Sequence, residues 1–165
     1  MRISVSFVLR IGGADSLAPL EKAMVYKDGE RAMHRDGGYY VFITPMKSGE
    51  RITVSASGFL PTELHWDGGF SAAVYLSREG VQPRELTLLS AGKYDKGAQE
   101  ITAVCPGGTL PAMLEGCTLK YGKHVAAIVG WNRAAGIIKL PPLEEKITQG
   151  QSLTVIAPTP ASDNK

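Results

Sequence analysis

The fold class is indicated most clearly by residues 36–44, which read DGGYYVFIT. From Tyr39 to Thr44 every residue is aromatic or β-branched, and both kinds favour extended backbone. The Asp-Gly-Gly that precedes them is typical of a turn, because Asp and Gly accept positive φ at little cost. This stretch therefore predicts a turn followed by a β-strand.

The combination of a short strand and a glycine-rich turn recurs along the chain. Apolar side chains alternate with mainly polar ones in residues 2–11, and this spacing of two predicts a strand with one buried face. Asp28-Gly29 predicts a hairpin turn. Further strands are expected at 20–27, 51–57, 64–66, 71–76, 86–89, 101–104, 137–140 and 152–156. No amphipathic helix stands out, so we expect an all-β protein of the sandwich or barrel type.

A polar stretch, SREGVQPRE at 77–85, divides the chain and contains both Gly80 and Pro83. It predicts a linker between two lobes, or alternatively a long loop. We expect a small β-sandwich in residues 1–80 and a small β-barrel or β-hairpin module in residues 86–157. Residues 158–165 are expected to form a disordered tail.

In the second lobe, one strand is expected to continue through the segment around Val125. Val125, Ala127, Val129 and Trp131 are spaced by two and are expected to share one face. Residues 132–136 then turn the chain, and the two prolines after Leu140 end the returning strand. Earlier in this lobe, residues 86–89 are expected to pair with residues 101–104.

Residues 23–64 resemble the carboxypeptidase-regulatory-like, transthyretin-type family of small sandwiches. The resemblance rests on DGGYYVF at 36–42, on Gly49, and on ITVSASGF at 52–59. It implies a structural or accessory module, and it brings no catalytic motif that could be transferred to this chain.

A second resemblance covers residues 126–155, which are similar to small β-barrel modules of phage tail and tail-like proteins. It rests on VGWN at 129–132, GIIKL at 136–140, Pro142-Leu143, and ITQGQSL at 147–153. It implies a structural part of a multi-protein particle.

Charge and hydropathy argue against two classes of partner. The formal net charge is only +2, and the 18 basic residues are scattered among 16 acidic ones, whereas nucleic-acid-binding proteins usually cluster their basic residues. Ser4 and Ser6 interrupt the apolar residues near the N-terminus, and no stretch approaches the roughly 20 apolar residues needed to cross a bilayer. We therefore expect neither nucleic-acid nor membrane binding, and a cytoplasmic or particle-associated location.

Two histidines precede Asp-Gly-Gly turns in the same way: His34 before Asp36, and His65 before Asp67. Residues two apart in a strand share a face, so two imidazoles and two carboxylates would make an acceptable metal site if the turns met. The alternative, which we favour, is that both aspartates serve turn geometry alone.

The cysteines offer little sign of catalysis. Cys105 or Cys117 could in principle act as a nucleophile with His124 as its base. The surrounding sequence matches no cysteine-protease signature, and no phosphate-binding loop or carboxylate pair stands out. We expect no enzymatic activity and no cofactor.

Aromatic residues crowd the first lobe. A surface of Tyr39, Tyr40, Trp66 and Phe70 could anchor a partner protein or a sugar. Alternatively these rings simply form the core, since each buries a large apolar area. Tyr39 and Tyr40 are adjacent and must point to opposite faces of a strand, so at least one of them leaves the core.

These observations favour a non-catalytic structural or assembly subunit of a multi-protein particle. The second resemblance implies that this particle is of the phage-tail-like kind. The chain's expected partners are other protein subunits, including copies of the chain itself. The alternative is a sandwich module that binds a carbohydrate or another ligand through the aromatic residues of the first lobe.

Overall fold

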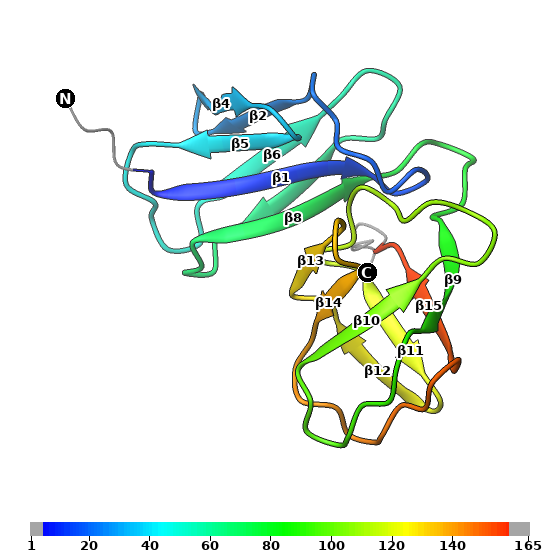
Figure 1. Cartoon of the computed structure of the whole chain (residues 1–165). Coiled ribbons are helices and arrows are strands. Elements are labelled where there is room, and N and C mark those ends of the chain that lie inside the picture. The colour runs from blue at the N-terminus through cyan, green and yellow to red at the C-terminus, as the bar shows by residue number, and fades with distance from the viewer. Residues whose placement is uncertain (1–4, 159–165) are drawn as a thin grey trace. The chain divides into compact units, whose positions relative to one another are not determined.

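The computed structural model describes residues 5–158, and within them the regular secondary structure consists entirely of β-strands (Figure 1). The expectation of an all-β protein is confirmed. Residues 5–158 contain no helix with the length and apolar character needed to cross a membrane.

The chain divides into two compact units, the first ending at Gln82 and the second spanning Pro83–Pro158. The division falls within the polar stretch 77–85. Apart from Pro158, the tail expected at 158–165 lies outside the described residues, as do the first residues of the strand expected at 2–11.

The first unit contains two four-stranded sheets. One has the order β4-β5-β1-β8 and the other the order β3-β2-β6-β7. The strands of the first sheet are β1 (Phe7–Gly13), β4 (Met33–Arg35), β5 (Tyr39–Phe42) and β8 (Ser71–Leu76). Those of the second are β2 (Met24–Lys27), β3 (Glu30–Arg31), β6 (Arg51–Ser55) and β7 (Thr62–His65). All neighbours pair antiparallel except β1 and β8, which are parallel.

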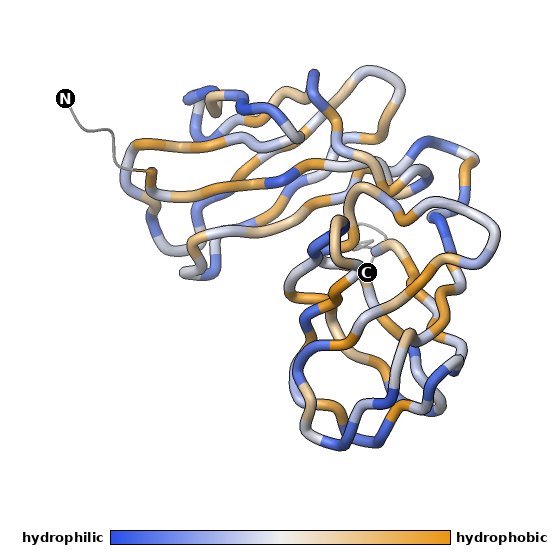
Figure 2. Tube along the Cα trace, viewed as in Figure 1, coloured by the Kyte–Doolittle hydropathy of each residue, from blue (hydrophilic) through white to orange (hydrophobic). Residues whose placement is uncertain are grey.

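Alternating apolar residues from both sheets meet in one core, as expected of a sandwich. Phe7, Leu9 and Ile11 of β1 are buried, and the cluster to which they belong includes Ile52 and Val54 of β6. Apolar and polar residues follow one another at short intervals along the strands of this unit (Figure 2). The predicted period of two therefore describes how the two sheets bury their inner faces.

The two turn predictions in the first unit are confirmed by backbone geometry. Asp28 and Gly29 have φ of 48° and 84°, as in the two-residue hairpin turns that favour Asp-Gly, and they join β2 to β3. Gly37 and Gly38, with φ of 91° and 80°, lie in the turn between β4 and β5. A Cβ atom on Gly38 would lie 2.6 Å from the Pro19 Cβ and 2.8 Å from the Ile11 oxygen, so glycine is required there.

The second unit is built on one seven-stranded antiparallel sheet with the order β12-β11-β15-β9-β10-β14-β13. Its strands are β9 (Glu85–Ser90), β10 (Glu100–Val104), β11 (Thr118–Tyr121), β12 (His124–Ala127), β13 (Gly130–Asn132), β14 (Ile137–Lys139) and β15 (Ser152–Ile156). The predicted pairing of 86–89 with 101–104 is confirmed by the β9–β10 ladder, in which Leu89 lies opposite Val104.

Strands β12 and β13 are two halves of one chain segment that changes its hydrogen-bonding partner. The Ile128 N–H donates to the Cys117 oxygen next to β11 (2.9 Å), whereas the Val129 N–H donates to the Lys139 oxygen of β14 (2.9 Å). The two outermost strands of the sheet, β12 and β13, are therefore consecutive parts of residues 124–132. Because β12 and β13 do not pair with each other, the sheet does not close into the barrel that was one of the two forms expected for this lobe.

Candidate functional site

The aromatic surface predicted from the sequence is not formed as one patch, and Tyr40 does not belong to it. Its side chain is only 2% exposed, its hydroxyl donates to the Leu20 oxygen (2.7 Å) and it accepts from the Ala23 N–H (2.9 Å). Burial raises the pKa of the Tyr40 hydroxyl above its ordinary value of 10.0. Placing Tyr40 on a partner surface was wrong, because the ring fills the core and the hydroxyl binds the chain that leads into β2.

The other three aromatics lie in different surroundings. Trp66 packs against the core, and its indole N–H donates to the Gly69 oxygen (2.7 Å). Tyr39 is 37% exposed and Phe70 is 61% exposed. They flank opposite sides of β1, because Tyr39 is in register with Arg10 while the Phe70 oxygen accepts from the Val8 N–H. The prediction that Tyr39 and Tyr40 face opposite sides is confirmed.

His34 binds a carboxylate that fastens the neighbouring turn. Its Nε2 lies 2.8 Å from Glu21 Oε1, and Glu21 also accepts from the N–H groups of Gly37 (3.2 Å) and Gly38 (2.9 Å). The bond from His34, aided by these backbone donors, holds the pKa of Glu21 below its ordinary value against the opposing effect of burial. The geometry therefore explains His34 as a residue of β4 that helps Glu21 to hold the β4–β5 turn.

His65 lies on β7, in the other sheet, with Nε2 3.8 Å from Glu63 Oε2. Asp67 Oδ1 accepts from the Gly69 N–H (3.1 Å), which is the turn chemistry expected of an aspartate before glycines. Throughout residues 5–158, no three His, Cys, Asp or Glu side chains come together in a group that could hold a metal ion. The four-residue metal set considered from the sequence is thus not assembled.

The two cysteines differ in burial, and Cys105 is partly buried. Cys117 is fully buried. The His124 ring nitrogens lie 3.9 Å from Glu144 and 3.7 Å from Glu145, and the ring is tilted against Tyr121. His124 therefore faces two carboxylates.

The structure reveals a charged groove that the sequence reasoning missed. It lies between the β2–β3 turn and the loop from β5 to β6, and we call it the hairpin groove. Its larger part has a volume of about 520 Å³, and an adjoining part of about 280 Å³ shares Asp28, Lys47 and Glu50 with it. The larger part is lined by Tyr26, Asp28, Gly29, Lys47, Ser48, Gly49, Glu50, Arg51 and Thr53.

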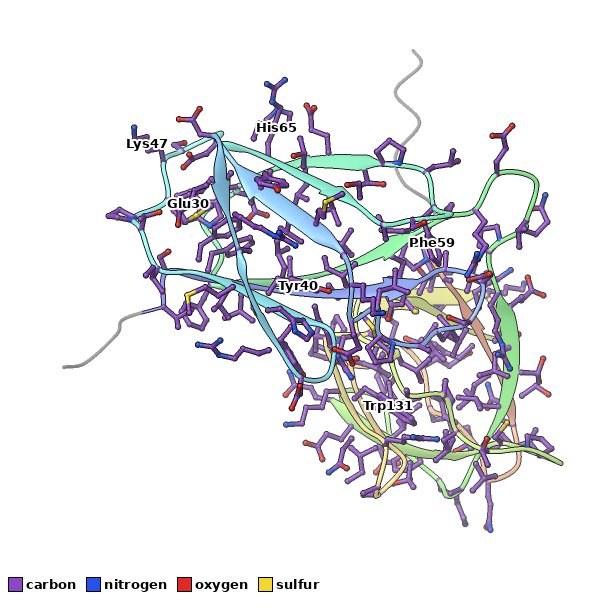
Figure 3. All side chains as sticks on the ribbon, turned by 90° about the horizontal axis from the view of Figure 1, so that it is seen from above. Glu30, Tyr40, Lys47, Phe59, His65 and Trp131 are labelled. Carbon is purple, nitrogen blue, oxygen red and sulfur yellow. The ribbon has the colours of Figure 1, made fainter. Side chains whose placement is uncertain are left out.

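A buried lysine ties the two walls of the hairpin groove together. Lys27 is 4% exposed, its Nζ donates to the Pro45 oxygen (3.1 Å) and to the Thr44 hydroxyl, and it lies 3.6 Å from Glu30 Oε1. The Thr44 hydroxyl in turn donates to Glu30. Figure 3 shows Glu30 and Lys47 at the same end of the first unit. A lysine at an inward strand position, between Val25 and the turn, was the sequence signal that could have indicated this site.

A second surface feature is the outer edge of β12 in the second unit. Val125, Ala127 and Val129 share the expected face, and that face is exposed: Val125 is 58% and Val129 64% exposed. The N–H and oxygen of Ile128 both point toward the β11 side, so the backbone groups of Val125 and Ala127 point the other way. Within residues 5–158, these groups have no hydrogen-bond partner on that side.

Comparison with protein-family models, with curated proteins and with solved structures finds no match to this chain.

Proposed function

We propose that this protein is a non-catalytic structural or assembly subunit, which joins a second copy of itself through the edge of β12. The proposal rests on the backbone N–H and carbonyl groups of Val125 and Ala127, which have no partner among residues 5–158 on the outer side of β12. The side chains of the same two residues are apolar and exposed. An unpaired edge of this kind is a template for another strand.

The contrast with the edges of the first unit supports this proposal. Proteins usually protect edge strands with charged residues, and three edges of the first unit carry them: β3 has Glu30 and Arg31, β4 has Arg35, and β7 has Glu63. The fourth edge, β8, is uncharged, but the chain that follows it is bound to a neighbouring turn. On β12, by contrast, Val125 and Ala127, whose backbone groups point away from β11, both have apolar side chains.

A second copy fits this edge by symmetry. In an antiparallel pair centred on Ala126, Val125 of each copy would lie opposite Ala127 of the other, and their outward N–H and carbonyl groups would bond reciprocally. No like charges would face each other in that register. Because one short strand pair buries little area, the contact is expected to be weak alone and effective where many copies assemble.

The second part of the proposal concerns the kind of particle that the protein helps to build. The likeness of residues 126–155 to small modules of phage-tail-like proteins supports a particle of that kind, since this stretch begins with Ala126 and Ala127, the last two residues of β12. The exposed strand edges of an all-β protein are compatible with such packing.

Sedimentation velocity of the purified chain tests the proposal. Wild-type protein is expected to form species larger than its 17.6 kDa monomer as concentration rises. Val125→Lys places a charge on the edge and is expected to leave only monomer, without a folding cost, because the side chain is exposed. Val104→Lys is the matched control, because Val104 is also exposed but lies on β10, which has a neighbouring strand on each side.

Two outcomes would overturn the proposal that β12 pairs with a second copy. One is a wild-type chain that stays monomeric up to high concentration, and the other is an oligomer that both lysine variants leave intact. The particle itself is tested by sedimenting tagged wild-type and Val125→Lys chains from lysates of the native host. A fast-sedimenting fraction that only the wild type joins supports the proposal, and lone monomer in both contradicts it.

A further inference from the structure

We infer that the hairpin groove binds a neutral polyhydroxylated ligand, one or two sugar rings in size. This site lies in the first unit and is independent of the β12 edge. The inference therefore goes beyond the proposed function, and either can fail without the other.

The size of the groove suits a small molecule. Its larger part, about 520 Å³, lies within the range of ligand sites, and the adjoining part extends it past Lys47 and Glu50. The groove is partly enclosed and partly open to solvent, as expected for a ligand that remains partly hydrated.

The charges of the lining select against a strongly charged ligand. Lys47 and Arg51 are cationic, while Asp28, Glu30 and Glu50 are anionic, so an anion or a cation would meet side chains of its own sign. Hydroxyl groups both donate and accept hydrogen bonds, so a polyol can satisfy both kinds of side chain at once.

Several of these polar groups are available to a ligand. The Arg51 guanidinium lies 3.7 Å from Glu63, an exposed pair of the kind that contributes little, so it can turn toward a hydroxyl. Thr53 and Ser48 add exposed hydroxyls to the lining. Glu50 is partly committed, because one of its oxygens accepts from the Lys47 N–H (3.0 Å).

Tyr26 supplies an apolar platform. It alternates with the buried Val25 and Lys27 and lies in register with Thr53, so its ring is on the outer face of the sheet, where it lines the groove. Aromatic rings offer a flat apolar area with a polar tip, and the carbon–hydrogen face of a sugar can cover such a ring. Gly29 and Gly49 have open space where a side chain would project, which lets a ligand approach the backbone.

The floor of the groove is built before any ligand arrives. The buried Lys27 holds Thr44 and Pro45 of one wall and Glu30 of the other. Because the walls are already joined, binding does not have to order them, and this favours measurable affinity from few contacts.

NMR titration of the full chain with cellobiose, chitobiose and maltose tests the inference. At least one of these sugars is expected to shift the amide signals of the groove, with Gly29, Gly49 and Thr53 among them. Tyr26→Ala is expected to weaken that binding about tenfold, which corresponds to about 1.4 kcal/mol. Tyr39→Ala is the matched control, because Tyr39 is an exposed tyrosine on the other sheet.

The role of charge is tested separately with Arg51→Met against Arg35→Met, two exposed arginines of the first unit. Only Arg51→Met is expected to weaken sugar binding, and this second variant serves if Tyr26→Ala fails to fold. The inference is overturned if no sugar shifts the groove signals, if shifts lie elsewhere, or if inorganic phosphate binds the groove more tightly than any of the sugars.

Discussion

Tyr40 shows how one residue joins the two sheets of the first unit. Its ring is buried among the apolar residues of the core, and its hydroxyl bridges the Leu20 oxygen and the Ala23 N–H on the way into β2. One side chain of β5 thus fixes the start of a strand in the other sheet.

Replacing Tyr40 by Phe removes only the hydroxyl and leaves these two backbone groups without that partner. We expect the free energy of unfolding to fall by about 1–3 kcal/mol, the cost of an unsatisfied buried polar group. Tyr39→Phe, on the exposed face of the same strand, should change it little. Urea denaturation of both variants measures this, and equal stabilities would contradict the role assigned to the Tyr40 hydroxyl.

Gly38→Ala tests the tightest backbone approach in the predicted turn. The new methyl would collide with Pro19 and with the Ile11 oxygen, so we expect a loss of at least about 2 kcal/mol, or failure to fold. Gly29→Ala is the control, because Gly29 has a similar φ of 84° but open space around it. Thermal unfolding of the pair separates collision from backbone strain, and equal losses would show that strain alone matters.

Some residues could be placed from the sequence and others could not, for a physical reason. Alternation correctly put Tyr39 and Tyr40 on opposite faces, but it does not say which face is buried. The inward position of Lys27 was equally hard to foresee as a site, since its partners Thr44 and Pro45 lie 17 and 18 residues away. Local patterns do not contain such tertiary partners.

At the scale of the element, the β4–β5 hairpin is held by a carboxylate from outside it. Glu21 binds His34 and the two turn glycines. Because its pKa is lowered in the folded protein, the charged form stabilises the fold. That contribution is complete above the ordinary pKa of 4.5 and disappears as pH falls through the lowered value.

We therefore expect Glu21→Gln to lower the melting temperature near neutral pH and to converge with wild type in strong acid. The effect should be modest, because both Glu21 and His34 are exposed. Calorimetry between neutral and strongly acidic pH checks this prediction. A difference from wild type that does not change with pH would contradict it.

Strand order was less accessible to sequence reasoning than strand location. Turn chemistry predicted the Asp28-Gly29 hairpin, alternation predicted most of β1 and β6, and a run of aromatic and β-branched residues predicted β5. The parallel pairing of β1 with β8 joins residues more than 60 positions apart, from Val8 with Ser71 to Gly13 with Leu76, and no local pattern encodes it. The change of partner between Ile128 and Val129 likewise divides a segment that the sequence predicted as one strand.

At the scale of the whole molecule, two compact β units lie on one chain, and each offers a different surface feature. The first unit has the hairpin groove, with its floor built around Lys27. The second has an uncharged edge on β12. Neither the groove nor the openness of that edge could be derived from the sequence, because the groove needs two distant loops and the edge depends on where β14 ends.

Amide hydrogen exchange at Val125 and Ala127 shows whether the edge of β12 pairs with a second copy of the chain. Their N–H groups point away from β11, so they should exchange quickly in dilute protein. We predict that their protection rises with protein concentration in the wild type, and that it stays low in Val125→Lys. Exchange at both amides that remains fast and independent of concentration in the wild type would contradict pairing at this edge.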